Sequence, residues 1–234
     1  QASVRPDTLL CQLNGPVHGR LSDGHGCDGY VVRINAPFLT AGFETVAAQV
    51  RAWLDQGIDL QVAMNISAND LEGQAFPERV ADVLRQWQLD AGSISFEVTE
   101  SALMKEPEIS LRCLARLRQL GVSLAVDDYG TGYSSLATLK SLPVQHLKID
   151  KSFVLQLASN KDDEIIVRST IELAHNMGLK VVAEGIEDIH SLEWLREHGC
   201  DYGQGYFISR PVAAEALAAW LRAQADQAVE ELSK

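Results

Sequence analysis

Residues 122–150 read VSLAVDDYGTGYSSLATLKSLPVQHLKID, and this stretch decides the predicted fold. An apolar, β-rich run at 122–126 leads into an acid pair and a loop with two glycines. A helical pattern over 134–141 then leads to a second β-rich run at 146–149. This order is typical of two parallel strands joined by a crossover helix. The stretch therefore predicts one β/α/β unit.

The same alternation continues on both sides of this unit. Further β-rich runs lie at 60–66, 93–98 and 180–183, with a weaker one at 200–206, and helical patterns cover 41–55, 77–88, 107–119, 162–177 and 189–198. Six such units fit either a doubly wound sheet or most of a (β/α) barrel. We favour the α/β class with a TIM-like (β/α)8 barrel, because almost every run ends in a polar residue. In a barrel these ends meet on one face.

The two ends of the chain differ from this pattern. Residues 1–35 are rich in glycine, and only 8–13 and 30–34 resemble strands, so we expect an atypical or rearranged N-terminal segment there. Residues 36–234 would form the barrel, in a single domain overall. Residues 212–232 form an Ala-rich helical pattern with Leu217, Trp220 and Leu221 on one side. We favour a closing helix packed on the barrel over the alternative, a homodimer surface.

Composition limits the classes of partner. The chain has 234 residues, 46% of them hydrophobic, and a net charge of −12 without a basic tract, which disfavours DNA. Its apolar runs are far shorter than the roughly 20 residues that span a bilayer, so no membrane segment is expected within this chain. The four cysteines form no close pair, which favours the cytoplasm. The first residue is Gln, so we expect a fragment of a longer protein, which could itself be membrane-attached.

Oxygen donors dominate the predicted strand ends. They are Asn65, Glu97, Asp127, Asp128 and Glu184. Carboxylate and amide oxygens suit hard cations such as Mg²⁺ or Mn²⁺, and a cation would neutralise the repulsion among these acids. Two cations would form the clamp used in phosphoester hydrolysis. A single acid at a strand end is more often a cap or a solvated residue, so the prediction depends on the whole set.

Two further residues extend this predicted site. Lys148 ends the run at 146–149, among the acids, where it could orient or deprotonate an attacking water or simply balance charge. Gln204 lies between two glycines, which let the backbone approach a ligand closely while the amide hydrogen-bonds to it. The pattern therefore indicates metal-dependent chemistry on a phosphate ligand.

At this point the sequence resembles a known family over residues 36 to 222. It is similar to EAL domains, bacterial phosphodiesterases that act on cyclic di-GMP. The matching motifs are Asn65-Ile66-Ser67, Glu97-Val98-Thr99-Glu100, residues 127–136, Lys148-Ile149-Asp150, Ala183-Glu184-Gly185-Ile186-Glu187, Gln204-Gly205-Tyr206 and Ser209-Arg210-Pro211. The resemblance implies a modified (β/α)8 barrel with one antiparallel strand. It also implies hydrolysis of cyclic di-GMP to pGpG with two Mg²⁺ or Mn²⁺ ions, often under an upstream regulatory domain of the GGDEF or PAS type.

The resemblance also implies a role for each site residue. Asn65, Glu97 and Asp127 would hold the first metal, and Asp127, Asp128 and Glu184 the second. Lys148 would serve the attacking water, and Glu100 would tether the loop after Asp128. Gln204, Asp150 and Glu187 would support the ligand or the metal shell.

The departure from the family lies at the start. The family is named for Glu-Ala-Leu on an early strand, whose Glu binds the first metal, but no Glu precedes Glu44 here. Our preferred register puts Thr8 at that position, with Asp7 adjacent, and an alternative that uses Arg33 puts Gly29 there. Two hypotheses follow: a phosphodiesterase whose activity is impaired, or a degenerate domain that binds cyclic di-GMP without hydrolysis. A third is a protein-docking scaffold.

Overall fold

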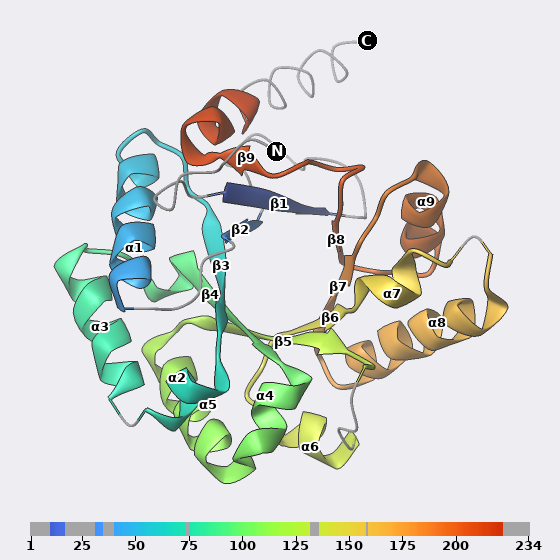
Figure 1. The fold of residues 1–234 in the computed structure, drawn as a ribbon, viewed down its shortest axis with the longest axis horizontal. Coiled ribbons are helices and arrows are strands. Elements are labelled where there is room, and N and C mark those ends of the chain that lie inside the picture. The colour runs from blue at the N-terminus through green and yellow to red at the C-terminus, as the bar shows by residue number, and fades with distance from the viewer. Residues whose placement is uncertain are drawn as a thin grey trace.

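The computed structural model describes residues 10–16, 31–34, 40–73, 75–131, 136–157 and 159–221. Their strands form one curled sheet in the order β2-β3-β4-β5-β6-β7-β8-β1-β9 (Figure 1). The strands are β1 (Leu10–Pro16), β2 (Val31–Ile34), β3 (Gln61–Ile66), β4 (Ile94–Thr99), β5 (Ser123–Tyr129), β6 (His146–Ile149), β7 (Lys180–Glu184), β8 (Tyr202–Gln204) and β9 (Val212–Ala213).

One strand closes the sheet into a ring. Strands β2 to β8 pair in parallel, each with the next. Strand β1 pairs antiparallel with β8 on one side and with β2 on the other. The short strand β9 pairs with the first two residues of β1, Leu10 and Cys11. The architecture is therefore the TIM-like α/β barrel that we predicted, with one antiparallel strand.

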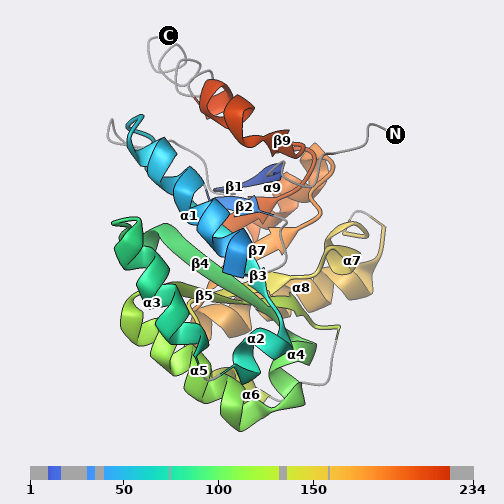
Figure 2. The ribbon, with the colours of Figure 1, turned by 60° about the vertical axis from the view of Figure 1, so that its left-hand side comes forward.

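Helices surround the ring on the outside (Figures 1 and 2). They are α1 (Thr40–Leu54), α2 (Ala68–Glu72), α3 (Phe76–Gln86), α4 (Glu100–Lys105), α5 (Pro107–Leu120), α6 (Leu136–Ser141), α7 (Lys151–Val154), α8 (Lys161–Asn176) and α9 (Ile189–Glu197). Helix α5 has its proline in the first turn and ends at Gly121, which takes the left-handed conformation with φ 98°. A proline start and a glycine stop are the usual boundaries of a helix.

The core lies between the ring and the helices. The first five residues of β4 are all buried, as expected for a parallel strand covered on both faces. Phe96 of β4 packs against Phe43 of α1 and Phe76 of α3, with ring centroids 5.7 Å apart in both pairs. These contacts fix two helices on the strand that carries Glu97.

Two details of the sequence interpretation need correction. The helical pattern at 162–177 predicts an apolar side that includes Ile165 and Ile166. These residues are 52% and 39% exposed, and α8 instead buries Val167, Ile171 and Ala174. At the C-terminal end, residues 212 and 213 form β9 rather than helix, and residues 214–221, the last that the structure describes, are helical. Leu217 and Leu221 are buried, so the helix packs on the barrel as we favoured.

The positions of β1 and β2 help to decide which residue of this chain aligns with the Glu of the family motif. Thr8 and Gly29 both lie outside the described residues. Strand β2, which contains Arg33, occupies the parallel position next to β3, whereas β1 runs antiparallel. A parallel position beside the Asn65 strand favours the Arg33 register over the Thr8 register that we preferred. The boundary between residues 35 and 36 stays a prediction.

Within the part of the chain that the structure describes, no helix is both long and apolar enough to cross a membrane.

Candidate metal and ligand site

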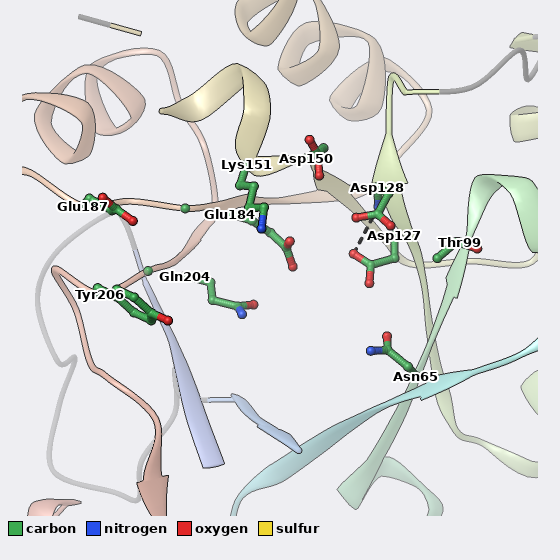
Figure 3. A pocket seen from close by; sticks show the side chains of 12 residues that line it. Asn65, Thr99, Asp127, Asp128, Asp150, Lys151, Glu184, Glu187, Gln204 and Tyr206 are labelled. Atoms are coloured by element: carbon green, nitrogen blue, oxygen red, sulfur yellow. Dashed lines mark hydrogen bonds between the residues drawn. The ribbon is translucent and has the colours of Figure 1, made fainter. Parts of the chain in front are cut away.

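A polar cavity of about 390 Å³ opens at the carboxyl ends of the parallel strands. Residues that follow or end β3, β4, β5, β6, β7 and β8 line it together (Figure 3). They are Asn65, Thr99, Asp127, Asp128, Asp150, Lys151, Glu184, Gly185, Glu187, Gln204, Gly205 and Tyr206. The structure therefore brings seven of the ten predicted site residues to one cavity. The other three, Glu97, Glu100 and Lys148, are buried close to it.

Lys148 is the centre of a buried ion-pair network. Its Nζ lies 2.8 Å from Glu97 Oε2 and 2.9 Å from Asp127 Oδ1, and it also pairs with Glu184. The side chain of Lys148 is only 1% exposed. A buried charge is tolerated only where it is paired, so three strands are held together by one ammonium group.

Three carboxylates face one another in front of this network. One oxygen from each of Asp127, Asp128 and Glu184 can be chosen so that all lie within 4.8 Å. Burial first, and then the charges of Asp127 and Glu184, raises the pKa of Asp128 above its ordinary value. The part of this shift that comes from Asp127 and Glu184 is repulsion among like charges, which a divalent cation would relieve. The donor set fits a hard cation such as Mg²⁺ or Mn²⁺.

The backbone at the acid pair is unusual. Asp128 has φ 53°, a left-handed conformation that few residues other than glycine adopt, and its N–H donates to Asp127 Oδ1 at 3.1 Å (Figure 3). Holding a non-glycine residue there costs about 1–3 kcal/mol, which the surrounding structure must offset. This conformation turns the two successive carboxylates of β5 toward the same cavity.

Asn65 and Glu97 lie on adjacent strands but occupy different environments. The two residues are paired in the register of β3 and β4. Asn65 lines the cavity, whereas Glu97 is 3% exposed and pairs with Lys148 behind it. The side of the cavity that Asn65 lines is therefore less acidic than the side formed by Asp128 and Glu184.

Glu100 anchors the segment that follows the acid pair. It is buried at the start of α4, and its Oε2 accepts a hydrogen bond from the N–H of Gly130 at 3.3 Å. The predicted tether between Glu100 and the loop after Asp128 thus has a direct contact. Residues 132–135 lie outside the described residues.

A close backbone approach forms the opposite wall of the cavity. Ile186 N–H donates to Gln204 O at 3.0 Å, and Phe207 N–H donates to Ile186 O at 3.0 Å. A Cβ on Gly205 would lie 2.0 Å from Ile186 O, so only glycine fits there. These contacts hold Glu187 and Gln204 on adjoining segments of one wall (Figure 3).

The sequence interpretation gave no role to two polar residues of the cavity, Thr99, which it quoted in a motif, and Lys151. Thr99 ends β4 and caps α4 by accepting from Ala102 N–H at 3.3 Å, and Lys151 begins α7 directly after Asp150. Both are polar residues at strand ends, which is the signal that identified the others. Tyr206, quoted in a motif without a role, lies on the rim, where Arg210 lies 5.2 Å from its ring centroid.

The chain matches known proteins over most of its length. Residues 33–211 match the family described as "EAL domain". The chain is 44% identical over 164 residues to the cyclic di-GMP phosphodiesterase NbdA of Pseudomonas aeruginosa, covering 70% of this chain and 21% of NbdA. It is 37% identical over 216 residues to the bifunctional diguanylate cyclase/cyclic di-GMP phosphodiesterase MucR of the same organism, covering 90% of this chain and 31% of MucR. The chain thus spans less than a third of either relative.

Solved structures agree with these matches. The EAL domain of Mycobacterium smegmatis DcpA superposes with a TM-score of 0.82 and 32% identity, over 94% of this chain and 98% of that one. A cyclic di-GMP complex of the P. aeruginosa MucR phosphodiesterase superposes with a TM-score of 0.78 and 31% identity, over 89% of this chain and 93% of that one.

Proposed function

Because the chain belongs to the EAL domain family, we propose that it binds cyclic di-GMP in the polar cavity and hydrolyses one phosphodiester bond to give pGpG. The observation that carries this proposal is the convergence of Asp127, Asp128 and Glu184 in front of the buried Lys148. Relatives named as cyclic di-GMP phosphodiesterases and a solved cyclic di-GMP complex support the choice of substrate. The cavity volume also lies within the usual range of small-ligand pockets, roughly 300–1,000 Å³.

The proposed mechanism divides the work between two walls. Asp127, Asp128 and Glu184 would hold one divalent cation, Mg²⁺ or Mn²⁺, and Asn65, Glu97 and Asp127 would hold a second. The ions would activate water and stabilise charge on the leaving oxygen. Lys148 would orient the attacking water, because its ammonium is fixed by three carboxylates from three strands. Asp150, Glu187 and Gln204 would hold the nucleotide on the other side. Glu100 would position the loop after Asp128.

A second candidate function is a cyclic di-GMP receptor that does not hydrolyse its ligand. One observation favours it: the residues of β1 and β2 include no carboxylate, although the family's namesake Glu belongs to an early strand. Such a domain would retain the cavity and bind cyclic di-GMP there, but it would not hydrolyse the ligand.

Product analysis separates the two functions. The protein is incubated with cyclic di-GMP and Mn²⁺, and the nucleotides are separated by chromatography. Appearance of pGpG, and its loss in Asp127→Ala, supports the phosphodiesterase, with Asp82→Asn on the exposed face of α3 as the matched control. Binding of cyclic di-GMP in Ca²⁺ without pGpG supports the receptor. An empty cavity under both conditions would point to a docking scaffold.

The cellular setting is also proposed from the relatives. A domain of this kind would act in the cytoplasm, and its longer relatives favour a regulatory domain elsewhere in the full protein.

A further inference from the structure

Lys151 is the only cationic side chain among the described residues that line the polar cavity. The same lining includes five carboxylates, Asp127, Asp128, Asp150, Glu184 and Glu187. Lys148, a second cation close to the cavity, is 1% exposed and already paired with three carboxylates. On this acidic surface, Lys151 is therefore the side chain that can offer a positive charge to an anionic ligand.

The ammonium group of Lys151 is available for such a contact. Its side chain is exposed, and it forms no ion pair with any other residue that the structure describes. Figure 3 shows this side chain reaching from the start of α7 into the cavity. The preceding residue, Asp150, instead caps α7, because its Oδ1 accepts hydrogen bonds from Ser152 N–H at 2.9 Å and from Ser152 Oγ.

A glycine fixes the base of the Lys151 side chain. A Cβ built on Gly185 would lie 2.6 Å from Lys151 Cβ and 3.2 Å from Lys151 Cα. Gly185 also has φ 79°, a conformation that other residues rarely adopt. This close approach places the first residue of α7 against the residue that follows Glu184 of β7. Since the backbone is held there, ligand binding needs to order only the end of the lysine side chain.

The two phosphates of cyclic di-GMP would meet different parts of this cavity. One oxygen from each of Asp127, Asp128 and Glu184 can be chosen so that all lie within 4.8 Å, and a divalent cation there would offset the charge of the phosphate that is cleaved. The two phosphates lie on opposite sides of the dinucleotide ring, so the second cannot share this position. Elsewhere in the lining, Glu187 would repel it and Lys151 would attract it.

We infer that Lys151 binds the phosphate of cyclic di-GMP that lies away from the acidic cluster and is not cleaved. The ammonium donates a charge-assisted hydrogen bond to an oxygen of that phosphate. The inference rests on the proposed function for the identity of the ligand. Because this phosphate keeps its charge throughout the reaction, the contact is equally strong in the bound substrate and in the transition state. Its loss therefore raises KM and leaves kcat unchanged.

The first test is calorimetry of the full chain with cyclic di-GMP in Ca²⁺. Lys151→Met should raise the Kd at least tenfold, whereas Lys151→Arg, which keeps the positive charge, should bind within threefold of the native protein. Lys161→Met is the matched control, since Lys161 is also an exposed first residue of a helix but does not line the cavity. Its Kd should equal that of the native protein.

Kinetics in Mn²⁺ tests which phosphate Lys151 contacts. In Lys151→Met, KM should rise at least tenfold while kcat stays within twofold of the native value. A fall in kcat at unchanged KM would overturn the inference, because it would place the lysine at the phosphate whose charge changes in the reaction. An unchanged Kd in Lys151→Met, an equal loss in Lys161→Met, or an equal loss in Lys151→Arg would also overturn it.

A substrate analogue separates a phosphate contact from a base contact, since lysine can also bind guanine O6 and N7. The analogue is cyclic di-GMP with one linkage replaced by an uncharged methylphosphonate. It should bind the native protein at least tenfold more weakly than cyclic di-GMP does. In Lys151→Met this ratio should fall below threefold, because the contact that the analogue loses is already absent. The same ratio in both proteins would overturn the inference.

The calorimetry also distinguishes failure of this inference from failure of the proposed function. Binding of cyclic di-GMP that Lys151→Met leaves unchanged refutes the role of Lys151 alone. A native protein that does not bind cyclic di-GMP at all refutes the proposed function and the role of Lys151 together.

Discussion

Lys148 links three acidic residues of the candidate site by ion pairs. Its ammonium lies among Glu97, Asp127 and Glu184, which come from three different strands. Sequence position placed all four residues at strand ends, so the convergence could be predicted. The burial of Lys148 and Glu97 behind the cavity could not, because the tilt of each strand decides which residue faces inward.

We expect Lys148→Met to destabilise the fold strongly when a chelator is present. The substitution keeps the side-chain volume but leaves buried carboxylates without their cation, and breaking a buried pair in this way costs about 3–5 kcal/mol. Chemical denaturation measures the loss. Lys105→Met is the control, because Lys105 is 55% exposed and its partner Glu72 is 36% exposed, so its loss should stay within about 1 kcal/mol. Similar losses of unfolding free energy in both variants would contradict the proposal that the buried ion pairs of Lys148 stabilise the fold.

We expect Gly205→Ala to disrupt the wall that carries Gln204. The new Cβ would lie 2.0 Å from Ile186 O, so the backbone of one segment must move. Affinity for cyclic di-GMP, measured by calorimetry in Ca²⁺, should fall at least tenfold. Gly178→Ala provides the comparison: φ is 75° there, but nothing lies within 4 Å of the new atom. Its effect should be limited to about 1–2 kcal/mol of backbone strain, with unchanged affinity.

At the scale of elements, the long helices, the short helix α6 and the strands other than β9 could be predicted, and three other short helices could not. The run at 146–149 coincides with β6, and the pattern at 107–119 with α5. Helices α2, α4 and α7 were missed because four to six residues are too few to show a helical period. Their N-caps, Ser67, Thr99 and Asp150, are polar residues at strand ends, and of these the sequence interpretation gave a site role only to Asp150.

Helix α8 offers a matched pair of isoleucines for testing its corrected orientation. Ile171 is 1% exposed, and Ile171→Ala should cost about 2–5 kcal/mol of unfolding free energy because it leaves a cavity. Ile165 is 52% exposed, and Ile165→Ala should change stability by no more than about 0.5 kcal/mol. Urea unfolding measures the stability of both variants. A larger loss in Ile165→Ala than in Ile171→Ala would support the predicted orientation, in which Ile165 lies on the buried side of the helix.

Asp201 joins α8, β7 and β8 at the other end of the barrel. It accepts hydrogen bonds from Lys180 Nζ at 2.6 Å and Val181 N–H at 2.9 Å, and His175 Nε2 lies 2.8 Å away. Burial alone would raise the pKa of Asp201, but these donors, Lys180 first, outweigh burial and lower it. A carboxyl group with a lowered pKa stabilises the fold fully above its ordinary pKa, and this contribution is lost as the pH falls from that value through the lowered pKa of the folded protein.

Asp201→Asn should therefore lower the Tm near pH 7, and the difference from the native protein should shrink below about pH 4. Thermal unfolding between pH 7 and pH 3.5 measures this. Asp82→Asn, on an exposed helix face, should show no such trend. A difference that grows toward acid pH would contradict the assigned direction of the pKa shift.

For the whole molecule, ion binding and folding should be linked, because the three carboxylates of the site meet only in the closed barrel. Saturating Ca²⁺ is expected to raise the Tm, since an ion at 100 times its Kd stabilises the fold by about 2.7 kcal/mol. The rise should vanish in Asp128→Asn and persist in Asp82→Asn. Equal rises in all three proteins would indicate a general salt effect instead of a specific site.

The position of β1 has a consequence for the order of folding. Its Asn14 pairs with Gln204, so the two partners lie 190 positions apart in the sequence. At a synthesis rate of roughly 5–20 residues per second, the ribosome would take about 10 to 40 s to deliver the second partner after the first. During that interval the earliest strand has at most one of its two neighbours. The loop-closure entropy of this pairing makes ring closure a slow, late event, and a chaperone that shields the waiting strand would have its greatest effect there.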